Sequence, residues 1–146
     1  MFNRIVVGTD GSETAAEAVR QAIDLAKLSG ATLSVVSAYE PVSKRRVEGE
    51  KLDAPADVQY ELNPREDVNL VLDSAAAAVR KEGVEVQTHP VEDDPADAIL
   101  NVAEETGADL IVVGSRGLNG VRRLFGSVPN AVTHNKEFHV LVVRTA

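Results

Sequence analysis

The chain has 146 residues, 44% hydrophobic but only 3% aromatic, so we expect a single domain over residues 1–146 with an interior of aliphatic side chains. Its 23 acidic and 15 basic residues give a formal net charge of -8, and this acidity argues against general nucleic-acid binding. The chain has no cysteine, which excludes disulfides and thiolate sites, and no apolar run of about 18 residues that could span a membrane.

The first part of the chain alternates between strand and helix patterns. Residues 2–8 form the short apolar run that is typical of a buried strand. Ser12 is a good helix N-cap, and apolar residues recur at helical spacing from 15 to 26 before Gly30 ends the helix. Residues 32–38 carry the pattern of a second strand.

Residues 41–62 break this alternation. They mix proline, glycine and charged residues without a period, which predicts a long, flexible surface loop. The Asn-Pro pair at 63–64 then predicts a helix N-terminus, and Gly83 predicts the end of that helix. Residues 84–91 alternate as a strand does, and the proline at 90 favours the edge of a sheet over its centre.

The second half of the chain restores the alternation. An Asp-Pro pair at 94–95 opens a helix that Gly107 ends, and Ser127 can cap a last helix. Residues 109–113 and 140–143 are the two remaining strands. Strands separated by helices need crossover connections. The sequence therefore predicts an α/β fold: one open, doubly wound, mostly parallel five-stranded sheet with helices on both faces.

Two glycine-containing segments follow the first and fourth predicted strands, at residues 8–12 (GTDGS) and 114–127 (GSRGLNGVRRLFGS). In open parallel sheets, ligands bind at the carboxyl ends of the strands where the winding reverses. Glycines let backbone amides approach a phosphate, and the N-terminus of the helix that begins at Ser127 attracts anions. The second segment is thus a candidate phosphate site, although it lacks the P-loop and dinucleotide-binding patterns, and glycines that merely form turns fit it as well.

Three stretches of the chain together resemble one family. They are IVVGTDGS at 5–12, VVGSRGLNGVRRLFGSVPNAV at 112–132 and HVLVVRT at 139–145. This combination resembles the universal stress protein family over essentially the whole chain, which implies a fold like that of the adenine nucleotide alpha-hydrolases. The glycine motif of the family's ATP-binding branch is matched, with one residue fewer than its commonest spacing between the second and third glycines, by Gly114, Gly117, Gly126 and Ser127.

The resemblance implies which residues would hold ATP. Those toward the base and sugar are Gly8, Thr9, Asp10, Ser37, Val113 and Gly114. Those toward the phosphates are Gly117, Gly126, Ser127 and Val128. In this assignment Asp10 accepts a hydrogen bond from the ribose, and Ser37 meets the adenine through its backbone. A Mg²⁺ ion would be held mainly by the phosphates, since magnesium keeps much of its water.

Several of these side chains also have an ordinary structural interpretation. Asp10 can cap the helix that Ser12 also caps, and the aspartates at 93–94 can cap the next helix. Arginines in the glycine segment could contact phosphates or balance nearby carboxylates; they are Arg116, Arg122 and Arg123. The histidines form no metal-binding pattern and no serine lies in a nucleophile elbow, so we expect neither a metal site nor a catalytic residue.

The resemblance implies a nucleotide-dependent regulator of a stress response, with at most weak ATPase activity. No P-loop lysine or evident catalytic base is present to support phosphoryl transfer. A slow ATP-hydrolysing enzyme with catalytic groups in residues 41–62, and a nucleotide-free interaction module, remain alternatives. The family also implies a homodimer through the strand Val140–Val143, which would cover an aggregation-prone edge. Without cysteine or a visible secretory signal, we expect a cytoplasmic protein.

Overall fold

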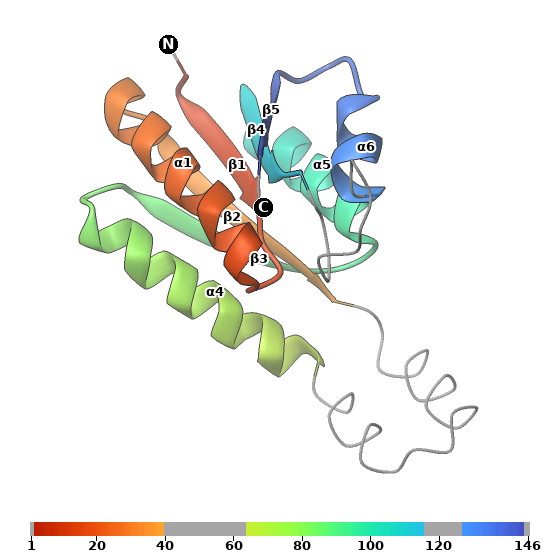
Figure 1. Cartoon of the computed structure of the whole chain (residues 1–146), viewed down its shortest axis with the longest axis horizontal. Coiled ribbons are helices and arrows are strands. Elements are labelled where there is room, and N and C mark those ends of the chain that lie inside the picture. Colours follow the sequence, from red (N-terminus) through yellow and green to blue (C-terminus); the bar gives the residue numbers. More distant parts are fainter. Residues whose placement is uncertain (1, 40–63, 116–126, 145–146) are drawn as a thin grey trace.

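A computed structural model describes residues 2–39, 64–115 and 127–144 (Figure 1). Its five strands form one sheet in the order β3-β2-β1-β4-β5, and every pairing is parallel. The strands are β1 (Arg4–Gly8), β2 (Thr32–Tyr39), β3 (Val86–Glu92), β4 (Leu110–Gly114) and β5 (Val140–Val143). The described helices are α1 (Glu13–Ser29), α4 (Pro64–Lys81), α5 (Pro95–Thr106) and α6 (Ser127–Thr133). The predicted α/β class with a parallel five-stranded sheet is confirmed.

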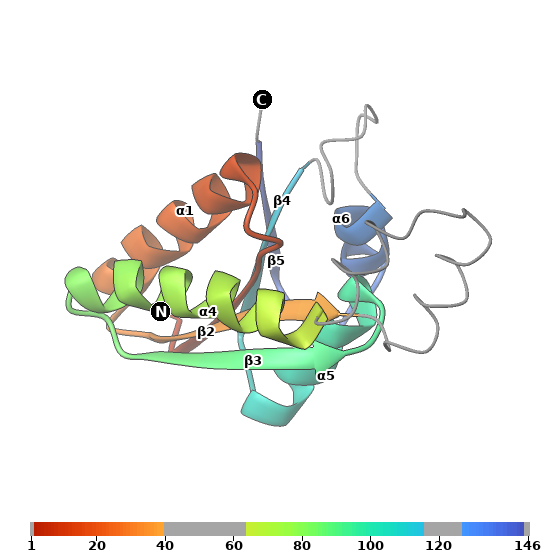
Figure 2. The same cartoon turned by 90° about the horizontal axis from the view of Figure 1, so that it is seen from below.

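The sheet separates two hydrophobic layers, because alternate residues of each strand point to opposite faces. On one face, α1 and α4 pack against Ile5 and Val7 of β1. On the other face, α5 and α6 pack against Val6 of β1 and Ile111 of β4. Figure 2 shows the two helix layers on either side of the sheet. Helices on both faces make the sheet doubly wound, as predicted.

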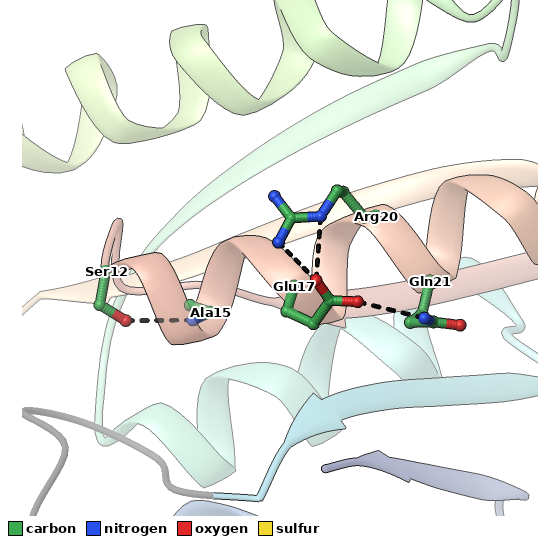
Figure 3. A network of polar contacts seen from close by, with 5 residues as sticks. All are labelled: Ser12, Ala15, Glu17, Arg20 and Gln21. Atoms are coloured by element: carbon green, nitrogen blue, oxygen red, sulfur yellow. Dashed lines mark hydrogen bonds and ion pairs between the residues drawn. The ribbon is translucent and has the colours of Figure 1, made fainter. Parts of the chain in front are cut away.

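The N-terminus of α1 begins where the sequence predicts. The Oγ of Ser12 accepts a hydrogen bond from the Ala15 N–H at 3.1 Å (Figure 3). Further along the helix, Glu17 accepts hydrogen bonds from Arg20 and Gln21. The Arg20 hydrogen bond, followed by that of Gln21, lowers the pKa of Glu17 below its ordinary value. Because these side chains face outward, they support a surface helix and belong to no buried site.

The strand β3 begins two residues later than the sequence pattern predicts. Gly83 takes a left-handed φ of 78°, and the Val84 N–H donates to the Val79 carbonyl at 3.4 Å. Val84 therefore completes the end of α4 and is buried beside the core, rather than joining the sheet. Pro90 lies in β3 at one edge of the sheet, as predicted, and β5 forms the other edge.

One prediction about the organisation of the chain concerns residues that the structure does not describe. The surface loop predicted over residues 41–62 lies outside them. Within them, no helix combines the length and the hydropathy that crossing a membrane requires.

Candidate functional site

The turn after β1 is held by its own backbone and side chains. The Thr9 N–H donates to the Val36 carbonyl at 2.9 Å, which ties the turn to β2. The Gly11 N–H donates to the Thr9 Oγ1 at 3.2 Å, and the Ser12 N–H donates to the Asp10 Oδ1 at 2.9 Å. One carboxylate oxygen of Asp10 thus closes the turn that leads into α1, close to the capping role considered for this residue.

The start of α5 lies near the same carboxyl ends of the strands as this turn. Asp94 caps this helix, because its Oδ2 accepts hydrogen bonds from the N–H groups of Ala96 at 3.2 Å and Asp97 at 3.4 Å. The Asp93 Oδ1 accepts one from the Asp94 N–H at 2.8 Å. The capping role predicted for this acidic pair is confirmed for Asp94. Pro95, the first residue of α5, borders a pocket.

That pocket opens where β1, β2 and β4 reach their carboxyl ends. It has a volume of about 580 Å³ when the space open to solvent is included. The strand β1 lies between β2 and β4 in the sheet, so the pocket sits where the winding of the chain reverses. The residues that line it are Gly8, Thr9, Asp10, Thr14, Ala15, Val36, Ser37, Ala38, Pro95, Ile99, Val113, Gly114 and Val128.

Seven of the ten residues that the resemblance assigns to a nucleotide border this pocket. They are Gly8, Thr9, Asp10, Ser37, Val113, Gly114 and Val128. Ser127 is the first residue of α6, whereas Gly117 and Gly126 lie outside the described residues. The arginines at 116, 122 and 123 lie outside them too. The structure therefore brings together the residues predicted for the base and sugar, while their contacts with a ligand stay a prediction.

Six further lining residues were not singled out from the sequence. They are Thr14, Ala15, Val36, Ala38, Pro95 and Ile99. Thr14 and Ala15 belong to the first turn of α1. Their nearness in sequence to the GTDGS turn could have predicted that they border the site. Pro95 and Ile99 come from α5. No local pattern connects α5 with β1, because only tertiary packing brings them together.

The side chain of Ile99 lies directly against the last residue of β1. A Cβ built on Gly8 would stand 2.5 Å from the Ile99 Cδ1 and 3.1 Å from its Cγ1. Carbon atoms in good van der Waals contact lie about 3.5–4.0 Å apart, so a larger residue at position 8 requires Ile99 to move. The glycine at this position thus allows α5 to approach β1 at the pocket.

The described lining of the pocket is mostly uncharged. Among these residues, Asp10 is the one with an ionisable side chain, and hydroxyl groups come from Thr9, Thr14 and Ser37. The described residues hold no group of three or more side chains suited to a metal ion. Such a surface suits a neutral ligand part that combines an apolar body with hydroxyl groups.

The histidines of the described segments have structural surroundings. The Nε2 of His89 on β3 is buried without a hydrogen-bond partner. Burial lowers the pKa of His89 below its ordinary value, and the Glu105 carboxylate opposes this shift. The Nδ1 of His134 lies 2.6 Å from the Asn130 carbonyl, and His139 packs edge-on to a phenylalanine ring. None of the three lines the pocket.

Comparison with known proteins identifies the family. The chain matches the model of the universal stress protein family over residues 1–144. The chain belongs to the universal stress protein family. A universal stress protein of Mycobacterium tuberculosis is 34% identical over 146 residues, and the match covers 99% of this chain and 97% of that protein.

Two solved universal stress proteins with bound nucleotides have similar structures. One, in complex with cAMP, is 33% identical, with a TM-score of 0.73 and coverage of 99% of this chain and 98% of that chain. The other, from Archaeoglobus fulgidus in complex with dAMP, is 26% identical, with a TM-score of 0.68 and coverage of 97% of each chain. Members of the family with this fold therefore bind adenine nucleotides.

Proposed function

We propose that this universal stress protein binds ATP in the pocket at the ends of β1, β2 and β4 and acts as a nucleotide-dependent regulator of a stress response. The observation that carries the proposal is that seven residues assigned to a nucleotide from the sequence border one pocket at the switch point of the sheet. The complexes of similar proteins with cAMP and dAMP support an adenine nucleotide as the ligand class.

The chemistry of the lining suggests how the ligand would lie. The apolar side chains of Val36 and Val113 suit the adenine ring, and the carboxylate of Asp10 suits the ribose hydroxyls. In this arrangement the base and sugar fill the described pocket. The phosphates extend toward the N-terminus of α6 and the predicted glycine segment, where Gly117, Gly126 and Ser127 would meet them. A Mg²⁺ ion would neutralise part of the phosphate charge and would need few protein ligands.

A regulatory role fits the lining better than an enzymatic one. Phosphoryl transfer needs a positioned nucleophile and strong charge stabilisation. The described part of the pocket supplies one carboxylate, and one oxygen of that group already closes the turn with Ser12. A steady-state ATPase assay with Asp10→Asn as the control tests the alternative of a slow enzyme. Turnover that the variant abolishes would favour that alternative.

A homodimer through β5 is a further part of the proposal. The described part of the sheet ends at β5, where Leu141 is 37% exposed. We expect Leu141→Lys to shift the protein toward a monomer in sedimentation experiments, because a lysine on an edge strand opposes edge-to-edge pairing. Leu70→Lys, which changes an exposed leucine of α4, is the matched control. A cytoplasmic location and the protein that responds to the regulator also remain proposals.

The deciding experiment is a calorimetric titration of nucleotide-stripped protein with ATP and Mg²⁺. We expect a dissociation constant near the micromolar range, on the order of -8 kcal/mol. Gly126→Asp should abolish binding, because it sets a negative charge where the phosphates are predicted. Ser74→Asp adds the same charge on the exposed side of α4 and should leave binding unchanged. No heat at millimolar ATP would refute the proposal and favour a nucleotide-free interaction module.

A further inference from the structure

The pocket has an apolar side and a polar side. The apolar side belongs to the hydrophobic layer between the sheet and α5, which includes Val36, Ile99 and Val113. The polar side is formed by the turn after β1 and the start of α1, with Asp10 and Thr14. A ligand that joins a flat ring to a hydroxyl-bearing group would therefore place its ring on the side of α5.

Ile99 is the lining side chain best placed to limit the depth of that apolar side. It is only 4% exposed although it borders the pocket, so nearly all of its surface is in contact with the protein. Its Cδ1 and Cγ1 fill the space beside Gly8 that a Cβ would otherwise occupy. Because protein interiors are close-packed and resist compression, a ligand cannot easily push this side chain aside.

The other apolar lining residues are less able to set the depth. Val36 and Val113 are strand residues with shorter side chains, at 1% and 2% exposure. Val128 is half-buried on the short helix α6. Ile99 reaches the same layer from α5, and its longer side chain ends beside the last residue of β1.

We propose that Ile99 sets the depth of the ring-binding side of the pocket and thereby restricts the site to an adenine ring without added hydrocarbon groups. This inference rests on the proposed nucleotide function and adds the residue that determines its specificity. Hydrophobic pockets discriminate by about 10–200-fold per methylene group when a larger ligand is excluded by size. Shortening Ile99 should therefore admit a purine that carries an extra hydrocarbon group.

The test compares ATP with three ATP analogues that carry a benzyl group at C2, N6 or C8 of the purine. We expect the wild-type protein to bind ATP and to bind at least one analogue about tenfold more weakly. In Ile99→Ala, the ratio of that analogue's affinity to the ATP affinity should rise by about tenfold. Val102→Ala is the matched control, since Val102 is buried on the same helix and in the same layer but does not line the pocket.

The outcomes separate this inference from the function on which it rests. If wild-type protein binds no ATP, the proposed function fails and the role of Ile99 fails with it. If ATP binds but Ile99→Ala leaves every analogue ratio within about twofold, or Val102→Ala gives the same gain, only the role of Ile99 is overturned. Should Ile99→Ala lose its circular dichroism signal, Ile99→Val tests the same point. It removes the Cδ1 nearest Gly8 and should give a smaller gain of the same sign.

Discussion

The contact between Gly8 and Ile99 predicts that the effect of a methyl group at position 8 depends on residue 99. In Gly8→Ala, the new Cβ would stand 2.5 Å from the Ile99 Cδ1. Overpacking a core costs about 1–3 kcal/mol, and we expect the middle of that range because the Cδ1 belongs to an almost fully buried side chain. Alanine also lowers the conformational entropy of the unfolded chain, which offsets about 0.4–1 kcal/mol of this cost. The net loss of stability should be about 1 kcal/mol.

The effect of Gly8→Ala on stability should change sign when residue 99 is already alanine. Ile99→Ala alone should cost about 2–5 kcal/mol as a buried large-to-small change. It also removes the two atoms that the new Cβ would strike, so Gly8→Ala in that background keeps only the stabilising term of about 0.4–1 kcal/mol. The coupling energy between the two positions should therefore be about 1–2 kcal/mol.

Urea unfolding followed by far-ultraviolet circular dichroism measures this cycle, because the chain has no tryptophan to report by fluorescence. With an m value of about 2 kcal/mol/M, each kcal/mol moves the midpoint by about 0.5 M. The four proteins of the cycle serve as controls for one another. Equal midpoint shifts for Gly8→Ala with isoleucine and with alanine at position 99 would refute the reasoning, since the contact would then carry no free energy.

Three other predictions test the turn, the helix cap and the buried histidine. Gly11 and Gly30 both have left-handed φ values, 83° and 72°, but a Cβ on Gly11 would lie 2.8 Å from Val71, whereas one on Gly30 would have no atom within 4 Å. Gly11→Ala should therefore destabilise the fold more than Gly30→Ala does. Equal losses of stability in urea unfolding would exclude a steric role for Val71. Ser12→Ala should cost about 1 kcal/mol in the same assay, through loss of the α1 cap, and an unchanged midpoint would contradict that role. Burial lowers the pKa of folded His89, so the unfolded chain binds more protons just below the ordinary value of 6.5, and stability falls as the pH drops through this window. His89→Leu should flatten the urea midpoint profile between about pH 5 and 8, whereas parallel profiles for the two proteins would argue against the shift.

The fold could be predicted because local patterns carry it. The Ser12 cap, the left-handed Gly30 and the Asp94 cap all lie where propensity and spacing indicated helix ends. The predicted start of β3 was wrong. Val84 is apolar enough for a strand, yet its N–H donates to the Val79 carbonyl near the end of α4. A one-dimensional pattern cannot distinguish these two ways of burying a valine.

The candidate site was predictable on one side only. Residues 8–10 and 113–114 lie at or just beyond the carboxyl ends of β1 and β4, so the rule for parallel sheets brings them together without any knowledge of packing. Ile99 lies in the middle of α5, where its periodicity indicates only a buried face. Its place at the pocket depends on how closely α5 approaches β1. The close approach of α5 to β1 depends on the missing side chain of Gly8. The apolar periodicity of α5 carries no information about that glycine.

Helices from both layers of the molecule border the pocket. The sheet separates the layer of α1 and α4 from the layer of α5 and α6 along most of its width. Beyond the carboxyl end of β1, Thr14 of α1 and Ile99 of α5 line one cavity. A nucleotide bound there would contact both layers at once. Its binding free energy would then depend on the positions of α1 and α5 relative to β1, which gives the proposed regulator a physical route from ligand to surface.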